Sequence, residues 1–112
     1  MIKGIRHTGI VVENLHSASE FYLALGFSIE SQAIEEGHFI ETVTGLTKVN
    51  LHWIKMTLPE GGMLELLEYK NPARRRQSRL TQPSNQVGVS HLAFTVENMN
   101  DFCELVLRIG GS

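Results

Sequence analysis

This sequence has little of what marks a secreted or membrane protein. It has one cysteine, Cys103, so an internal disulfide is impossible and a reducing compartment is the simpler expectation. No apolar run approaches the roughly 20 residues that span a bilayer. The first residues contain neither an apolar core of signal-peptide length nor a small-residue cleavage site. We therefore expect a cytoplasmic protein with no membrane partner.

An excess of one charge is also missing. Ten Lys and Arg residues stand against twelve Asp and Glu residues, which gives a formal net charge of −2. Without a basic field, nucleic acid is not an expected partner. No glycine-rich phosphate loop follows a predicted strand, and Gly61 with Gly62 is better explained as part of a turn. The remaining composition, 42% hydrophobic over 112 residues, is that of one globular domain.

Hydrophobic spacing predicts the order of the secondary structure elements. Two-residue alternation indicates strands, and apolar residues three and four apart indicate helices. Asn14 and Ser17 are equally good caps for the first helix, and Gly26 is placed to end it. The predicted elements are a strand over 5–13, a helix over about 15–25, strands over 27–36, 49–58 and 63–70, a strand over 87–96 and a helix over 100–109, with an ambiguous segment at 38–45 and a hairpin turn at 59–62.

The chain repeats part of itself. The segment HTGIVVENL at 7–15 resembles HLAFTVENM at 91–99, and the offset of 84 holds through the helix that follows. Seven of twenty positions are identical between 7–26 and 91–110, with no gap. We therefore predict a complete βαβββ module at 1–70, a linker at 71–86 and the first βα of a second module at 87–112. The counterpart of Glu65 would be position 149, so we expect a partner chain, or residues beyond position 112, to supply it.

Three residues in this pattern can bind a metal ion. His7 and His91 occupy equivalent positions on the strand face with small or polar neighbours, as expected for a cavity lining. Glu65 lies in the apolar run MLELLEY, where a carboxylate must be solvated, paired or bound to a metal. The alternative is that its strand is an edge and Glu65 faces water. Two imidazoles and one carboxylate suit Zn, Ni, Co, Mn or Fe(II), and the sequence does not distinguish among them.

Other polar residues give weaker signals. His52 and Trp53 are adjacent on a predicted strand, so they face opposite ways and one of them could line the cavity. An arginine cluster in the linker could clamp an anion, although a solvated loop is favoured. This cluster consists of Arg74, Arg75, Arg76 and Arg79.

Taken together, these motifs resemble the vicinal oxygen chelate superfamily, which includes glyoxalases, bleomycin-resistance proteins and extradiol dioxygenases. The resemblance rests on the two His-led strands, the helix SASEFYLALGF and the strand LELLEY, and it spans about 5–110. It implies an α+β fold in which βαβββ modules form an open, cup-shaped mixed sheet with helices on the outer face. It also implies a homodimer and the metal ligands His7, Glu65 and His91.

The same resemblance implies a function. It suggests a metal-dependent lyase or isomerase, like a glyoxalase or a methylmalonyl-CoA epimerase. The expected substrate is a small molecule with vicinal oxygens, such as a thiol adduct or an acyl-CoA. Two alternatives stay open: a non-catalytic binding module of the bleomycin-resistance type, and a ring-cleaving dioxygenase. No catalytic residue beyond the metal ligands is assigned.

Overall fold

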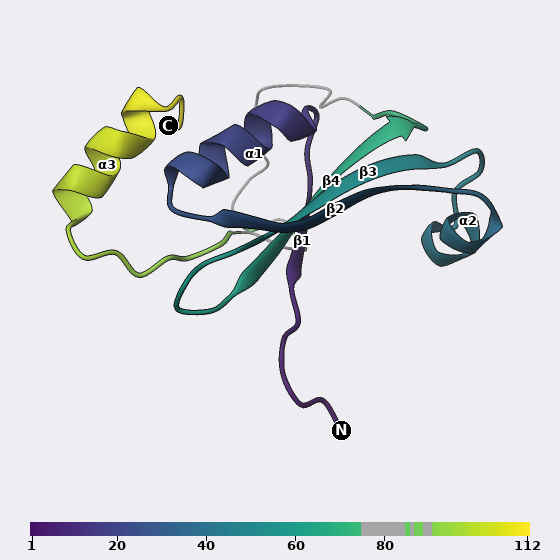
Figure 1. Cartoon of the computed structure of the whole chain (residues 1–112), viewed down its shortest axis with the longest axis horizontal. Coiled ribbons are helices and arrows are strands. Elements are labelled where there is room, and N and C mark those ends of the chain that lie inside the picture. The colour runs from purple at the N-terminus through teal and green to yellow at the C-terminus, as the bar shows by residue number, and fades with distance from the viewer. Residues whose placement is uncertain (75–84, 86, 89–90) are drawn as a thin grey trace. The chain divides into compact units, whose positions relative to one another are not determined.

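The computed structural model describes residues 1–74, 85, 87–88 and 91–112. The chain divides into two compact units, 1–74 and 75–112. No described helix is long and apolar enough to cross a membrane. The order of the elements confirms the predicted βαβββ arrangement, with a short helix in the ambiguous segment (Figure 1). The elements are β1 (Thr8–Val11), α1 (Leu15–Ala24), β2 (Ser28–Glu36), α2 (His38–Thr44), β3 (Asn50–Thr57), β4 (Met63–Asn71) and α3 (Met99–Arg108).

The four strands of the first unit form one open mixed sheet in the order β1-β4-β3-β2. β2, β3 and β4 are antiparallel neighbours, whereas β1 pairs with β4 in parallel. β4 therefore lies inside the sheet, between β1 and β3. The alternative that Glu65 stands on an edge strand is wrong, because its strand has a hydrogen-bonded neighbour on each side.

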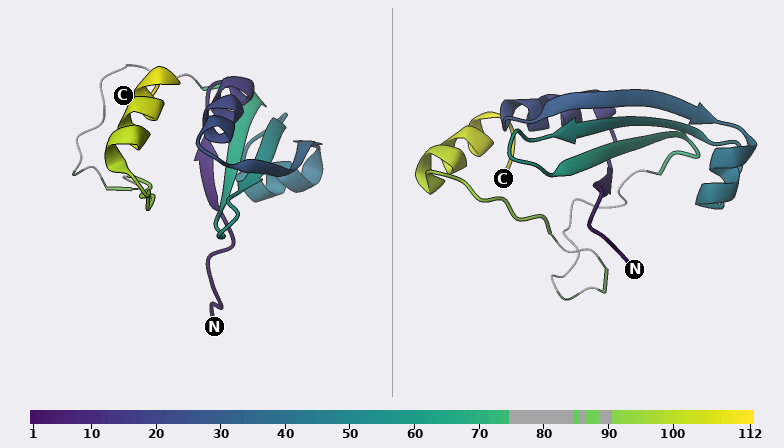
Figure 2. Two further views of the ribbon diagram at one scale, coloured as in Figure 1. Left: turned by 60° about the vertical axis from the view of Figure 1, so that its left-hand side comes forward. Right: turned by 60° about the horizontal axis from the view of Figure 1, so that its bottom comes forward.

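The two faces of this sheet are covered differently. α1 packs on one face, over the buried side chains Leu64 and Leu66 of β4. α2 packs on the opposite face at one end, where Ile40 meets Leu51 and Trp53 (Figure 2). We call this second face the open face. Between the end covered by α2 and the N-terminal segment it carries Gly9, Val11, Trp53, Lys55, Glu65 and Leu67.

The ends of α1 follow from its sequence. Asn14 is the N-cap, and its side-chain oxygen accepts a hydrogen bond from the Ser17 backbone N–H at 2.9 Å. Gly26 has a φ of 102°, which a residue with a side chain rarely adopts, and its N–H donates to the Leu23 carbonyl. The helix thus stops where β2 must begin.

Glu68 fixes the start of α1 to the sheet. Its Oε2 accepts a hydrogen bond from the Leu15 backbone N–H at 2.9 Å, and its Oε1 lies 2.7 Å from Lys70 Nζ. Burial acts to raise the pKa of Glu68, but the hydrogen bonds from Lys70 and Leu15, together with nearby positive charge, outweigh it and lower this pKa. The ionised carboxylate therefore stabilises the helix start.

The second unit contributes α3, which begins and ends like α1. Asn98 caps it, 84 residues after Asn14, and Gly110 has a φ of 96°, 84 residues after Gly26. Three backbone hydrogen bonds at the C-terminal end of each helix also recur at this offset. The shared capping agrees with the sequence repeat, and the division into modules at 1–70 and 87–112 stays a prediction.

The predicted strand over 87–96 is not found in its described residues, 87–88 and 91–96. A β-strand is held by hydrogen bonds to a neighbouring strand, and no described residue pairs with this segment. Most of the predicted linker, 75–84 and 86, lies outside the described residues.

Truncation of the buried core should destabilise the protein strongly. Leu66 is fully buried, so we expect Leu66→Ala to lower the free energy of unfolding by about 2–5 kcal/mol. Ile34 is 60% exposed on β2, and Ile34→Ala should change it by less than about 1 kcal/mol. Urea denaturation followed by circular dichroism measures both values. Equal losses in the two variants would contradict the described core.

The lowered pKa of Glu68 predicts a pH-dependent contribution to stability. The stabilisation from its carboxylate is present above the ordinary pKa of 4.5 and is lost as the pH falls through the lower folded-state value. Glu68→Gln should therefore be less stable than wild type at pH 7, and this difference should shrink as the pH falls below 4.5. Urea unfolding of both proteins, at intervals of about one pH unit between pH 3 and pH 7, measures this difference in stability. A difference that is constant over this range would contradict the role given to Glu68.

Candidate functional site

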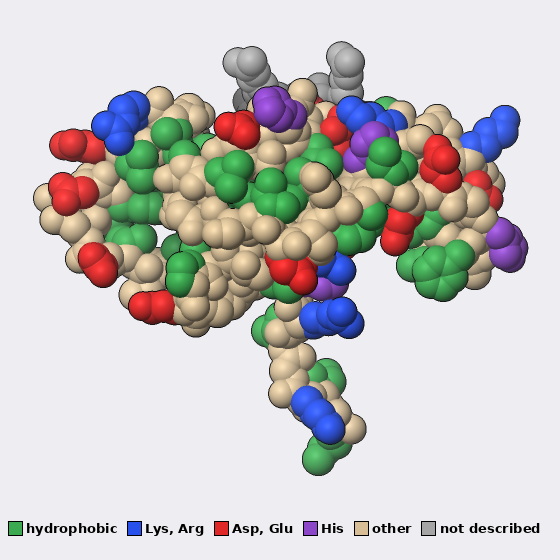
Figure 3. All heavy atoms as spheres, viewed as in Figure 1, with side chains coloured by type: hydrophobic (Ala, Val, Ile, Leu, Met, Phe, Trp, Pro, Cys, Tyr) green, Lys and Arg blue, Asp and Glu red, His purple; other side chains and the backbone are tan. Residues whose placement is uncertain are grey.

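His7 and Glu65 lie side by side on the open face. The parallel pairing of β1 with β4 sets Gly9 directly opposite Glu65, and His7 precedes Gly9 by two residues on the same side. His7 Nε2 lies 2.9 Å from Glu65 Oε2, and the two side chains are 31% and 15% exposed. Figure 3 shows acidic, basic and histidine side chains gathered where the N-terminal segment meets the sheet. Two residues far apart in sequence thus form a polar pair on a largely apolar sheet.

This pair keeps unused bonding capacity. His7 Nδ1 is buried and has no hydrogen-bond partner among the described residues. The 2.9 Å contact between Nε2 and Glu65 Oε2 therefore holds the imidazole in place. A buried nitrogen without a hydrogen-bond partner costs free energy in the folded state.

The geometry of the pair fits two ligands of one divalent ion. Two neighbouring ligands with bonds of about 2.1 Å at a right angle are about 3.0 Å apart. The observed separation of 2.9 Å between His7 Nε2 and Glu65 Oε2 is close to this value. An imidazole and a carboxylate are also a donor set that Zn, Ni, Co, Mn and Fe(II) accept.

The neighbours of the pair pack closely on the open face. A Cβ added at Gly9 would lie 3.3 Å from Leu67 Cδ1, so the absence of a side chain there lets Leu67 pack against β1. Across β3, Lys55 is directly opposite Glu65, and Trp53 is opposite Leu67. Trp53 therefore lines the open face, which settles the choice that the sequence left open. Its neighbour His52 faces α1, opposite Glu68.

The remaining predicted residues are placed as follows. His91 belongs to the second unit and is exposed there. Within the described part of the chain, no three His, Cys, Asp or Glu side chains gather as a metal site. Arg74 is exposed, while Arg75, Arg76 and Arg79 lie outside the described residues. Of the three predicted ligands, the structure brings His7 and Glu65 together.

Sequence reasoning missed Lys55. Its ammonium lies 4.7 Å from the centre of the Trp53 ring, two residues back along β3. The pattern Trp-x-Lys on a strand that forms a hairpin with the strand of Glu65 was a usable signal. Its meaning depended on the register of that hairpin.

Comparison with known proteins agrees with this fold. The family model for the Glyoxalase/Bleomycin resistance protein/Dioxygenase superfamily matches residues 6–112. The crystal structure of a glyoxalase family protein from Bacillus cereus is similar, with a TM-score of 0.88 and 29% identity, over 98% of this chain and 74% of that chain. The crystal structure of SMU.1112c shares the fold with a TM-score of 0.64 and 20% identity, over 98% and 77%. Among curated proteins, no significant match was found.

A double-mutant cycle on His7 and Glu65 should detect their contact without any metal. An ion pair between partly exposed side chains contributes up to about 1 kcal/mol. We expect a coupling free energy of about 1 kcal/mol between His7→Ala and Glu65→Ala. Urea unfolding of the four proteins in the presence of a chelator measures it. Additive effects of the two substitutions would show that the contact contributes nothing.

Proposed function

Because this chain belongs to the Glyoxalase/Bleomycin resistance protein/Dioxygenase superfamily, we propose that it acts as a glyoxalase-like, metal-dependent lyase or isomerase. The proposed substrate is a small molecule with vicinal oxygens, such as a thiol adduct or an acyl-CoA. The observation that carries the proposal is the 2.9 Å separation of His7 Nε2 and Glu65 Oε2 on the open face of the sheet. These two donors would hold a divalent ion.

Each residue of the pair has a separate task. His7 offers a neutral nitrogen, and Glu65 offers a negative charge that offsets part of the charge of a cation. A divalent ion bound there supplies Lewis-acid polarisation of a substrate carbonyl. Gly9 lies opposite Glu65 without a side chain, which lets the Leu67 side chain pack close to β1. Trp53 and Leu67 give this part of the face apolar walls.

His91 is proposed as a third ligand on the strength of the sequence repeat, since it follows His7 by 84 residues. A homodimer is part of the same proposal. β1 stands at the edge of the sheet, and strands with a free edge tend to pair with another chain. We place the protein in the cytoplasm, in keeping with its single cysteine.

A second candidate is a binding module that encloses a small molecule without a metal. It is favoured by one observation, that no described group of three His, Cys, Asp or Glu side chains forms a metal site. A ring-cleaving dioxygenase would instead need Fe(II), so metal preference separates it from the lyase or isomerase.

Metal addition should stabilise the wild-type protein and not the ligand variants. A ligand at 100 times its dissociation constant raises the free energy of unfolding by about 2.7 kcal/mol. We expect Zn²⁺, Ni²⁺, Co²⁺, Mn²⁺ or Fe(II) to raise the melting temperature of wild type. His7→Ala and Glu65→Ala should lose this rise, and His91→Ala should reduce it. Thermal unfolding with and without each metal, the Fe(II) series without oxygen, measures the effect.

His38 provides the matched control, because it is an exposed histidine on α2. His38→Ala should keep the full metal-dependent rise. If no metal stabilises wild type, or if His7→Ala and Glu65→Ala respond like wild type, the metal proposal is wrong and the metal-free binding module is favoured.

A further inference from the structure

Lys55 is the positive charge on the open face that the proposed metal site does not use. It stands on β3 directly opposite Glu65, so the two side chains leave the sheet on the same side. Its ammonium nevertheless lies over the Trp53 ring, 4.7 Å from the ring centre. Among the described residues, no carboxylate comes within ion-pair distance of it.

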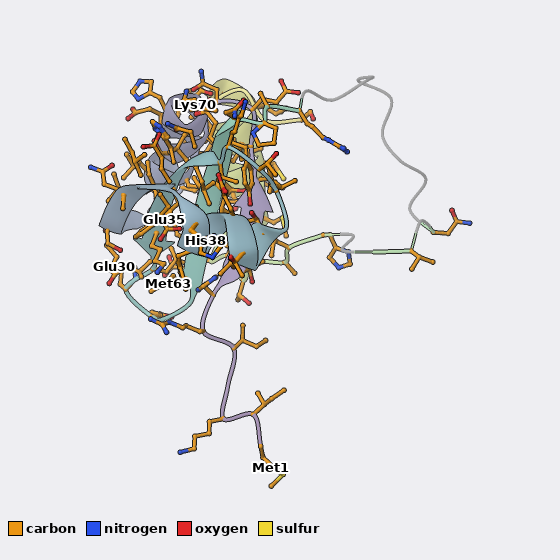
Figure 4. The ribbon with its side chains drawn as sticks, turned by 90° about the vertical axis from the view of Figure 1, so that its right-hand side faces the viewer. Met1, Glu30, Glu35, His38, Met63 and Lys70 are labelled. Atoms are coloured by element: carbon orange, nitrogen blue, oxygen red, sulfur yellow. The ribbon has the colours of Figure 1, made fainter. Side chains whose placement is uncertain are left out.

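Nearby acidic groups are already occupied by other partners. Glu65 is held by His7 at 2.9 Å. Glu30 precedes Ser31, the residue opposite Lys55 on β2, and its carboxylate accepts the Ser31 hydroxyl hydrogen bond at 2.7 Å. Lys70 is at the far end of β4 from Met63 and is paired with Glu68 (Figure 4). Lys55 is thus an ammonium held in place by stacking, with its hydrogen-bond donors available.

A lysine beside a metal site needs an explanation in terms of charge. A divalent ion on His7 and Glu65 leaves a net positive charge, because one carboxylate offsets only half of it. A second cation across the strand pair repels that ion unless an anion binds near both. Stacking on Trp53 keeps the ammonium on the open face, although the ammonium would be better hydrated if it extended into solvent. The whole patch is therefore complementary to an anionic ligand that also offers oxygens to the metal.

We propose that Lys55 binds an anionic group of the ligand, a carboxylate or a phosphate, while the oxygens at the other end of that ligand reach the site at His7 and Glu65. The inference rests on the proposed metal site and adds to it the substrate class. Among the vicinal-oxygen molecules proposed above, that class is the acids with two anionic groups, one of them next to a hydroxyl or carbonyl oxygen. The hydrogen bond from the Lys55 ammonium to this anionic group is charge-assisted, and such a bond is stronger than one between neutral groups.

Three 2-hydroxy acids that share the same chelating end test this role of Lys55. Lactate has only that end, malate adds a carboxylate, and 3-phosphoglycerate adds a phosphate. Calorimetric titration of the Ni²⁺-loaded protein with each acid gives the affinities. We expect malate or 3-phosphoglycerate to bind wild type about tenfold more tightly than lactate. Whichever of the two binds more tightly shows whether Lys55 binds a carboxylate or a phosphate.

Substitution of Lys55 should remove this discrimination and also change the metal affinity. In Lys55→Met, the three acids should differ by less than about twofold. Ni²⁺ itself should bind Lys55→Met about three- to tenfold more tightly than wild type, since a repelling charge is gone. Lys55→Arg keeps the charge and can stack on Trp53, so it should retain the preference. Lys3→Met removes the same charge from the exposed N-terminal segment and should behave like wild type.

The outcomes separate this inference from the proposed function. If wild type binds Ni²⁺ through His7 and Glu65 but binds the three acids equally, the role of Lys55 is wrong and the metal site stands. If Lys55→Met keeps the preference for the second anionic group, the role is likewise wrong. Failure of wild type to bind Ni²⁺, Zn²⁺, Co²⁺, Mn²⁺ or Fe(II) overturns the metal site and this inference with it.

Discussion

The parallel pairing of β1 with β4 is the constraint on which the rest of this unit depends. It is the contact that sets Gly9 opposite Glu65 and thereby brings His7 to the carboxylate. Parallel neighbours cannot be joined by a tight turn, so the intervening chain must cross and return. α1, β2 and β3 fill that crossing, and α1 covers the face that β1 and β4 share. The polar pair on the opposite face is a consequence of this topology.

Much of this arrangement was accessible from the sequence because it is encoded locally. Apolar spacing and capping residues predict the βαβββ order, and Asn14 and Gly26 mark the ends of α1 as expected. The repeat pointed to His7, and a carboxylate within the apolar run MLELLEY pointed to Glu65. What the sequence could not supply was their contact, since the order of strands in a sheet is not a local property. A hydrophobic pattern shows that a strand has a buried face and leaves its neighbours undefined.

The side of the sheet on which Trp53 lies depends on one residue of register. A four-residue loop at 59–62 would put His52 on the face of Glu65. The structure has a five-residue loop, because β3 ends at Thr57 opposite Met63. A shift of one residue exchanges the two faces of a strand, so Trp53 and Lys55 lie with Glu65 instead. Loop length in this hairpin therefore decides which side chains surround the polar pair.

The pairing of β1 with β4 also sets the order in which the parts of the site can form. Thr8 pairs with Leu64, so the pairing of β1 with β4 closes a long loop of the chain. By contrast, β3 and β4 are joined by a short turn. Contacts between residues distant in sequence form slowly, because the entropy of closing a long loop must be overcome first. On a ribosome, β1 and α1 emerge well before β4 exists. His7 can therefore meet Glu65 only once β4 has been made and has paired with β1.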